Sequence, residues 1–67
     1  MSGGYASYPF MAKQLVNFPG EWVRVIKPRS MKSVQDNIIR AHRAGLNAEL
    51  REDGYVWIQY PNKEDNS

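Results

Sequence analysis

The apolar residues of this chain recur with two different periods, and these periods predict its secondary structure. Residues 22–26, with the sequence WVRVI, are rich in β-branched and aromatic side chains and precede a proline, which is typical of a short strand. A helical period follows, because Val34, Ile38 and Ala41 fall on one stripe at 3.6 residues per turn. Gly45 is well placed to end this helix in the left-handed conformation.

Two serines compete for the start of the helix. Ser33 and Asp36 match the S-x-x-D pattern of a capping box, in which the serine accepts a hydrogen bond from the backbone near the acid. We therefore expect the helix to begin at Ser33. Ser30 is the alternative start, and it would add Met31 and Lys32 to the first turn.

A hairpin is predicted over residues 47–60, and the length of its loop decides which side chains share a face. A two-residue turn at Asp53-Gly54 would mix apolar and charged residues on both faces. A three-residue loop with Gly54 in the left-handed conformation pairs Arg51 with Tyr55, and we choose this register. It aligns the apolar residues Ala48, Leu50, Val56, Ile58 and Tyr60 on one face. The other face then carries Asn47, Glu49, Arg51, Tyr55, Trp57 and Gln59.

The residues before the first strand predict a short helix over 9–18. Pro9 suits the first turn, and Met11, Leu15 and Phe18 follow at i, i+4 and i+7. The alternative is an extended strand at the edge of the domain.

The predicted fold class is α+β: a small three-stranded sheet (β-α-β-β) with one main helix packed on one face, and a short N-terminal helix before it. Val23 and Val25 would join the covered face, which leaves Trp22, Arg24 and Ile26 on the other. This second face is either covered by the N-terminal helix or open to a partner. We favour cover, because two bare tryptophans on so short a chain would promote aggregation.

The composition allows one small domain with a modest core. With 67 residues and no cysteine, the chain has neither disulfides nor thiolate-bound metal to stabilise it. We expect one domain over 9–61, between a flexible arm at 1–8 and a mobile polar tail at 62–67. No apolar run is long enough to cross a bilayer, and the N-terminus does not resemble a signal peptide. The expected location is therefore the cytoplasm, with no membrane partner.

Catalytic chemistry has few residues to use. His42 is the sole imidazole, and we expect it at the edge of the buried stripe, packed on the core rather than acting as a base or ligand. Glu49, Glu52 and Asp53 lie on and beside an exposed turn, where no burial would tune them for acid/base work. The sequence also has no glycine-rich phosphate loop. We therefore expect a protein that is not an enzyme and has no metal or cofactor.

Positive charge gathers between Trp22 and Arg43, where six basic residues face one acid, Asp36, for a formal charge of +5. Free N–H groups at the helix start and the cations around them could hold a phosphate or carboxylate. We expect Arg40 and Arg43 to point away from the core together, with Asp36 able to pair with Arg40. The candidate nucleic-acid or anion-binding residues are Lys27, Arg29, Lys32, Arg40 and Arg43.

A second candidate surface combines aromatic rings with arginines on one sheet face. Its composition is typical of platforms that stack unpaired bases, and also of the anchors of protein interfaces. The competing interpretation is a second small core, in which these rings pack against Phe10, Met11, Leu15 and Phe18. The candidate partner-binding residues are Trp22, Arg24, Arg51, Tyr55 and Trp57.

The stretch WVRVIKPRSMKSVQ, followed by IIRAHRAG and a short hairpin, resembles small orphan proteins carried by phages of actinobacteria. The resemblance covers Trp22 to Gly45 and rests on a valine-rich strand, a basic turn with proline and an S-M-K-S helix start. The chain departs from that pattern at Val34, where those proteins carry alanine. The resemblance implies a source and a size class with no activity attached. Short phage products of this kind often bind a host protein or a nucleic acid in the cytoplasm of the host cell.

Two functions follow as hypotheses. The first is a phage-type accessory protein that binds nucleic acid or nucleoprotein through its basic helix and loop. The second is a protein-interaction module that inhibits or adapts a host complex through the aromatic sheet face. Its partner could be an acidic host protein. A homo-oligomer is one form of the second hypothesis.

Overall fold

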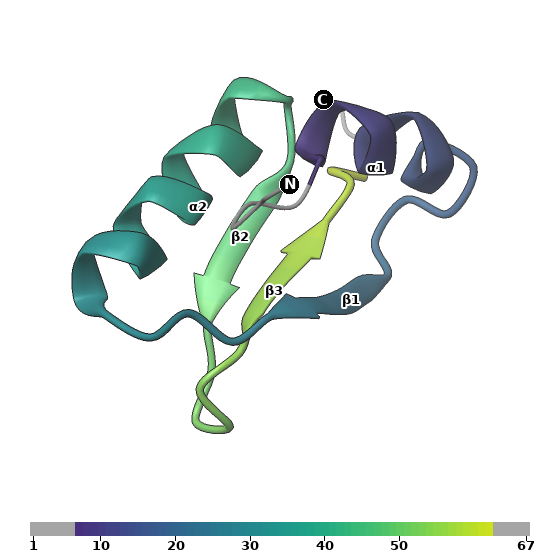
Figure 1. The fold of residues 1–67 in the computed structure, drawn as a ribbon. Helices are drawn as coiled ribbons and strands as arrows, with labels where there is room; N and C mark the ends of the chain where they lie inside the picture. The colour runs from purple at the N-terminus through teal and green to yellow at the C-terminus, as the bar shows by residue number, and fades with distance from the viewer. Residues whose placement is uncertain (1–6, 63–67) are drawn as a thin grey trace.

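The structure, a computed structural model, describes residues 7–62 and contains two helices and one three-stranded sheet (Figure 1). The elements are α1 (Tyr8–Leu15), β1 (Trp22–Ile26), α2 (Met31–Arg43), β2 (Asn47–Leu50) and β3 (Val56–Gln59). The strand order is β1-β3-β2, and β3 pairs antiparallel with both neighbours. The predicted α+β class, with β-α-β-β order and a short N-terminal helix, is confirmed.

Helix α2 begins earlier than the capping-box pattern predicted. Ser30 is the N-cap, with an extended backbone, and its side-chain oxygen accepts a hydrogen bond from the Ser33 backbone N–H at 3.2 Å. The prediction of Ser33 as the first cap is therefore wrong, and the alternative start holds. The earlier start leaves the Ser33 carbonyl inside the helix, where it accepts a hydrogen bond from the Asn37 side chain at 2.8 Å.

The end of α2 follows the prediction. Gly45 has φ +86°, and its N–H donates to the His42 carbonyl at 2.9 Å. The next N–H, of Leu46, donates to the Ala41 carbonyl at 2.9 Å, which completes a Schellman motif. Because Leu46 and Ala41 are both buried, the same turn ties the helix end to the core.

The hairpin has the three-residue loop that the distribution of side chains favoured. The backbone N–H of Arg51 donates to the Tyr55 carbonyl at 3.1 Å, and Gly54 has φ +84°. The strands pair Ala48 with Ile58 and Leu50 with Val56. The predicted pairing of Arg51 with Tyr55 and the separation of apolar from polar side chains are confirmed.

Strand β1 contains an irregularity that the sequence pattern did not predict. Trp22, Val23 and Arg24 pair with Gln59, Ile58 and Trp57 in order. The register then shifts by one, so Ile26 lies opposite Val56, and both pack with the core. The assignment of Ile26 to the second face is therefore wrong, because a bulge reverses the alternation of side chains beyond it.

Helix α1 lies on the same side of the sheet as α2 (Figure 1). It ends at Leu15, so the predicted helix over 9–18 is right in kind but too long, and Phe18 lies outside it with 56% of its surface exposed. It begins with Tyr8, which is buried, although that residue was assigned to the flexible arm over 1–8. The rest of that arm and of the expected tail over 62–67 lies outside the described residues, apart from Ser7 and Asn62.

A buried polar pair explains where α1 packs. The Tyr8 hydroxyl donates to the Asn37 side-chain oxygen at 2.7 Å, and Asn37 has no exposed surface. Burial raises the pKa of Tyr8 above its ordinary value, while the positive charge of Arg40 opposes that shift. Because both side chains are paired, their burial carries no unsatisfied polar atom at this contact. The bond therefore fixes α1 against α2.

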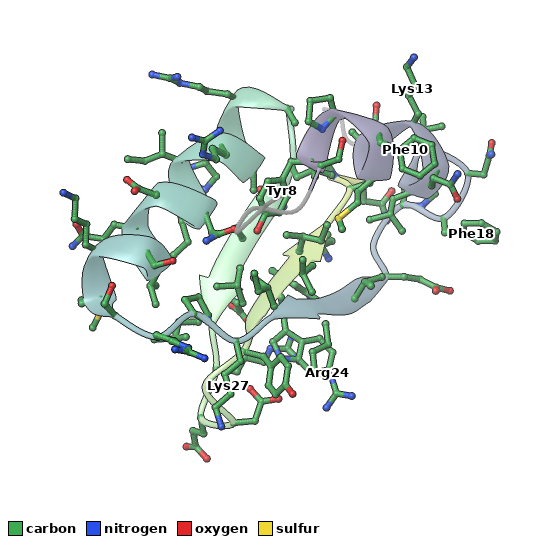
Figure 2. The ribbon with its side chains drawn as sticks, viewed as in Figure 1. Tyr8, Phe10, Lys13, Phe18, Arg24 and Lys27 are labelled. Carbon is green, nitrogen blue, oxygen red and sulfur yellow. The ribbon has the colours of Figure 1, made fainter. Side chains whose placement is uncertain are left out.

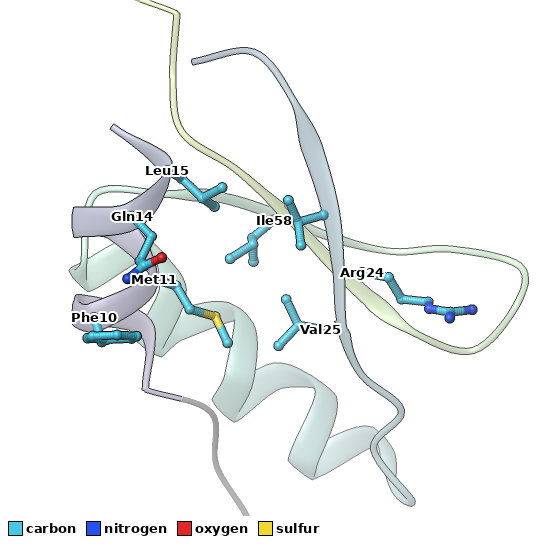
Figure 3. Close-up of a pocket in the computed structure, with 8 residues that line it drawn as sticks. Phe10, Met11, Gln14, Leu15, Arg24, Val25 and Ile58 are labelled. Carbon is cyan, nitrogen blue, oxygen red and sulfur yellow. The ribbon is translucent and has the colours of Figure 1, made fainter. Parts of the chain in front are cut away.

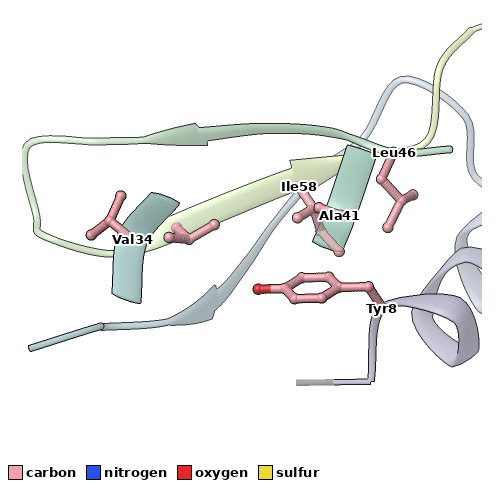
Figure 4. Packing of buried hydrophobic residues seen from close by; sticks show 6 residues of the cluster. Tyr8, Val34, Ala41, Leu46 and Ile58 are labelled. Atoms are coloured by element: carbon pink, nitrogen blue, oxygen red, sulfur yellow. The ribbon is translucent and has the colours of Figure 1, made fainter. Parts of the chain in front are cut away.

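The core lies between the helices and the sheet (Figure 4). Two of the expected core residues are exposed instead: Leu50 by 41% and Val23 by 37%. Both lie on edge strands, Leu50 next to the hairpin loop and Val23 on β1, while α2 packs on β2 and β3. The buried apolar side chains are Tyr8, Val34, Ala41, Leu46, Val56 and Ile58.

His42 is exposed, which corrects its expected position against the core. Around the axis of α2, Asn37 and His42 lie on opposite sides of the stripe formed by Val34 and Ala41. Helix α1 packs along the Asn37 side through Tyr8, so the buried sector is turned away from His42.

Candidate functional site: the open face of the sheet

The second face of the sheet has no helix over it in the described chain, because α1 and α2 share the other side. Arg24 pairs with Trp57, and the neighbouring pair, Val23 with Ile58, points to the helices. Figure 2 shows Arg24 and Lys27 on the side of the sheet away from the helices. The open face, as we call it, consists of Trp22, Arg24, Lys27, Arg51, Tyr55 and Trp57.

Cover of this face by the N-terminal helix was the favoured expectation, and it is wrong. Met11 and Leu15 of α1 pack on the main core instead, and Phe10 and Phe18 are exposed. Tyr8 holds α1 on the other side, because its buried ring packs in the main core and its hydroxyl bonds to Asn37 of α2. The five residues expected on this face are therefore brought together and left accessible.

One half of the open face is built around Arg51. Its guanidinium carbon lies 4.3 Å from the centre of the Trp57 ring and 5.0 Å from the centre of the Trp22 ring. Its Nε donates to a carboxylate oxygen of Glu49 at 2.6 Å. The two indoles thus share one cation, whose charge is matched by an acid. This group of side chains is called the tryptophan cluster below.

Asp53 in the hairpin loop orients the rings. Its carboxylate accepts a hydrogen bond from the Tyr55 backbone N–H at 2.9 Å and from the Trp57 indole N–H at 3.2 Å. Along the same face, the Asn47 side chain donates to the Gln59 side chain at 2.8 Å. The bond from Asp53 holds the Trp57 indole before any ligand arrives, which reduces the entropy lost on binding.

The other half of the open face has a different charge. The Arg24 guanidinium lies 4.6 Å from the centre of the Tyr55 ring, and the Lys27 ammonium lies 5.9 Å from it. Within residues 7–62, neither cation forms an ion pair with an acid. The Lys27 stem passes beside Gly54, so its charge is held at the hairpin end of the sheet. We call Arg24, Lys27 and Tyr55 the tyrosine cluster.

The basic residues singled out in the sequence are not brought together. Lys27 belongs to the tyrosine cluster, while Arg29 and Lys32 lie at the start of α2. Arg40 and Arg43 are exposed in its last turns, so Lys32 and Arg43 are separated by roughly 16 Å along the helix axis at 1.5 Å per residue. The expected contact between Asp36 and Arg40 stays a prediction.

An apolar hollow between α1 and β1 was missed by the sequence analysis (Figure 3). It has a volume of about 340 Å³ and lies where α2 does not reach β1. The exposed phenyl ring of Phe10 and the side chain of Val23 stand at its walls. Only the spacing of α1 from β1 creates it, and no sequence signal marks that spacing. Its other lining residues are Met11, Gln14, Leu15, Arg24, Val25 and Ile58.

The described part of the chain has neither a metal-binding cluster nor a membrane-spanning helix. No group of three or more His, Cys, Asp or Glu side chains is arranged to hold a metal ion there. No helix among the same residues is long and apolar enough to span a membrane. In comparisons with known proteins, no family model, no curated protein and no solved structure matches this chain.

Proposed function

We propose that this protein binds single-stranded nucleic acid on the open face and is not an enzyme. One observation carries the proposal: three aromatic rings and three cations lie together on a sheet face that neither α1 nor α2 covers. Aromatic rings on a sheet are a common means of stacking unpaired bases, and arginine planes stack in the same way. Lys27, one of the five basic residues that the sequence suggested, joins the aromatic residues in this site, while the other four lie on or before α2.

Stacking on the aromatic rings of this face favours a single strand over a duplex. Bases in a duplex are stacked on one another and expose only their edges, so they cannot lie flat on a sheet. Base stacking on an aromatic side chain contributes about 1–3 kcal/mol per base. Two stacked bases with a few phosphate contacts would then give useful affinity even though the net charge is only +2.

The cations on and just before α2 can be tested as additional phosphate contacts. Arg29, Lys32, Arg40 and Arg43 lie on or before the helix that packs on the opposite side of the sheet, away from the open face. A strand that follows the aromatic rings would not pass over the helix. We therefore propose the open face as the primary site and the basic helix as the alternative location.

Binding and its location can be measured in one experiment. Fluorescence anisotropy at ~50 mM salt, where phosphate contacts are strong, would compare labelled single-stranded DNA, single-stranded RNA and duplexes of the same sequence. We expect both single strands to bind more tightly than the duplexes. Trp57→Ala should weaken binding about 5- to 150-fold, the loss that stacking of one base implies, while Arg40→Ala combined with Arg43→Ala should change it little. The reverse result would move the site to the helix, and no binding to any probe would exclude the function.

A protein partner is the second candidate, because Trp, Tyr and Arg are the residue types that dominate binding energy in protein interfaces. The same open face would then contact an acidic host protein or a second copy of the chain. Such a complex should be affected less by salt than by truncation of Trp57 and Tyr55. Capture from a host lysate with and without nuclease distinguishes the two functions, since a nucleic-acid-dependent complex is lost on digestion.

A further inference from the structure

We propose that the open face is divided, so that the tryptophan cluster stacks a base while Arg24 and Lys27 hold the phosphate next to it. The ligand that fits is thus a short single strand bound by one base and an adjoining phosphate. This inference rests on the proposed function and adds a role for each half of the site.

The charge of each half supports the division. In the tryptophan cluster, the Arg51 guanidinium is bonded to Glu49 at 2.6 Å, so a phosphate there would meet a cation whose charge is already matched. The Asp53 carboxylate lies between the two halves, because it accepts hydrogen bonds from the Trp57 indole N–H at 3.2 Å and from the Tyr55 backbone N–H at 2.9 Å. In the tyrosine cluster, the Arg24 guanidinium and the Lys27 ammonium lie 4.6 Å and 5.9 Å from the centre of one ring, with no ion pair to an acid of residues 7–62. A phosphate would therefore be attracted to those two cations.

The geometry of Arg51 suits a base rather than an anion. Its guanidinium lies over two indole rings, and its Nε is occupied by Glu49. A base can displace the guanidinium and stack directly on the Trp57 ring, or it can stack on the outer side of the guanidinium. Both the indole ring and the guanidinium plane are flat and delocalised, so both can stack with a base. In either arrangement the contact is made by stacking, which depends little on salt.

The two halves are close enough for one nucleotide step. Arg24 is the cross-strand partner of Trp57, so the phosphate-binding side chain starts beside the stacking ring. Tyr55 precedes Trp57 by two residues and projects from the same face. A single strand can therefore place a base over the tryptophan cluster while its adjoining phosphate reaches Arg24.

Salt dependence separates the two roles. For single strands, each phosphate contact contributes about 0.7 to the slope of log affinity against log salt. Because Arg24 and Lys27 hold one phosphate, Arg24→Gln combined with Lys27→Gln should lower that slope by about 0.7, and each change alone by part of that amount. Arg43→Gln is the matched control, because it removes an exposed arginine on the helix side, and its slope should equal that of the unmodified protein.

Stacking is tested with the same oligonucleotides and a backbone that lacks bases. Trp57→Leu should weaken binding about 5- to 150-fold with an unchanged salt slope, the range that stacking of one base implies. Removing the bases from the probe should weaken its binding to the unmodified protein by a similar factor. The same change should weaken its binding to Trp57→Leu much less. Arg51→Lys keeps the positive charge but lacks the flat guanidinium on which a base can stack. We expect it to weaken binding in the same way as Trp57→Leu, but by a smaller factor.

The outcomes distinguish the division from the function itself. Circular dichroism must show a native fold for each variant. If Trp57→Leu does not fold, Arg51→Lys replaces it as the test of stacking. If the protein binds single strands but Arg24→Gln and Lys27→Gln leave the slope unchanged, the division is wrong and the proposed function stands. Equal binding of normal and base-free strands by the unmodified protein would also overturn the division. If no single strand binds at all, the proposed function fails with it.

Discussion

The two faces of the same sheet differ in how they use their side chains. Towards the helices, Val56 and Ile58 are completely buried and belong to one apolar cluster. On the open face, Tyr55 and Trp57 are only half-buried and lie next to cations. Because consecutive residues of β3 point to opposite faces, the chain places stability and candidate binding chemistry on alternate positions. Substitutions at neighbouring residues should therefore have effects of different kinds.

The largest expected effect is on the covered face. Ile58→Ala removes a fully buried side chain from the central strand, and large-to-small changes of this type cost about 2–5 kcal/mol. Since a domain of this size has little stability to lose, we expect the variant to be largely unfolded. Urea unfolding followed by circular dichroism measures this directly. A variant with near-normal stability would mean that the helices do not form the stabilising layer.

The second effect concerns the polar contact between the helices. Tyr8→Phe leaves the buried Asn37 oxygen without its donor at 2.7 Å, which should cost about 1–3 kcal/mol in the free energy of unfolding at neutral pH. The comparison with Tyr8→Leu, which also removes the ring, separates the hydrogen bond from packing. Equal stability of Tyr8→Phe and the unmodified protein would show that the bond contributes nothing.

Alkaline pH tests the same contact. Burial raises the pKa of Tyr8 above its ordinary value of 10.0, so the folded state holds the hydroxyl proton more tightly than the unfolded chain does. The associated stability is fully present below that ordinary value and is lost as pH rises through the folded pKa. Between about pH 9 and about pH 11, the unmodified protein should lose more stability than Tyr8→Phe. Parallel losses would assign the alkaline effect to other groups.

The hairpin loop gives the next prediction. Gly54→Val forces a β-branched residue to φ +84°, and its Cβ would lie 3.1 Å from the Lys27 Cε. A left-handed conformation costs such residues about 1–2 kcal/mol, so the free energy of unfolding should fall by about that amount. Gly54→Asn is the control, because asparagine tolerates this conformation better. A Gly54→Val variant as stable as the unmodified protein would exclude the three-residue loop.

These residues also show how much the sequence could predict. The loop at Gly54 was predictable because only one register separates apolar from charged side chains along the hairpin. The start of α2 was ambiguous, because Ser30 and Ser33 both have the chemistry of a cap and lie three residues apart. The bulge that turns Ile26 inward has no local signal.

The open face was predicted in composition but not in accessibility. Alternation of side chains placed Trp22, Arg24 and Trp57 together before the structure was known. Whether α1 would cover them depended on Tyr8, whose partner Asn37 is 29 residues away in the chain. A contact at that separation leaves no periodic pattern, so residues before the first strand gave no reason to place the helix on either side. The link between Lys27 and the aromatic residues was missed for the same reason.

The smallest expected change in stability is on the open face, and it provides the sharpest test of the comparison. Lys27→Gln removes a charge 5.9 Å from the Tyr55 ring but keeps most of the stem beside Gly54. Exposed substitutions usually change stability by less than about 0.5 kcal/mol, so the urea midpoint should stay almost unchanged. The affinity for a single strand and its salt slope should fall in the same sample. Removing an exposed cation–π contact costs no more than about 1 kcal/mol. A larger loss of stability would therefore indicate that the cations around Tyr55 hold the hairpin together. The open face would then be a second stabilising surface, and the division of the sheet into one structural and one binding face would not hold.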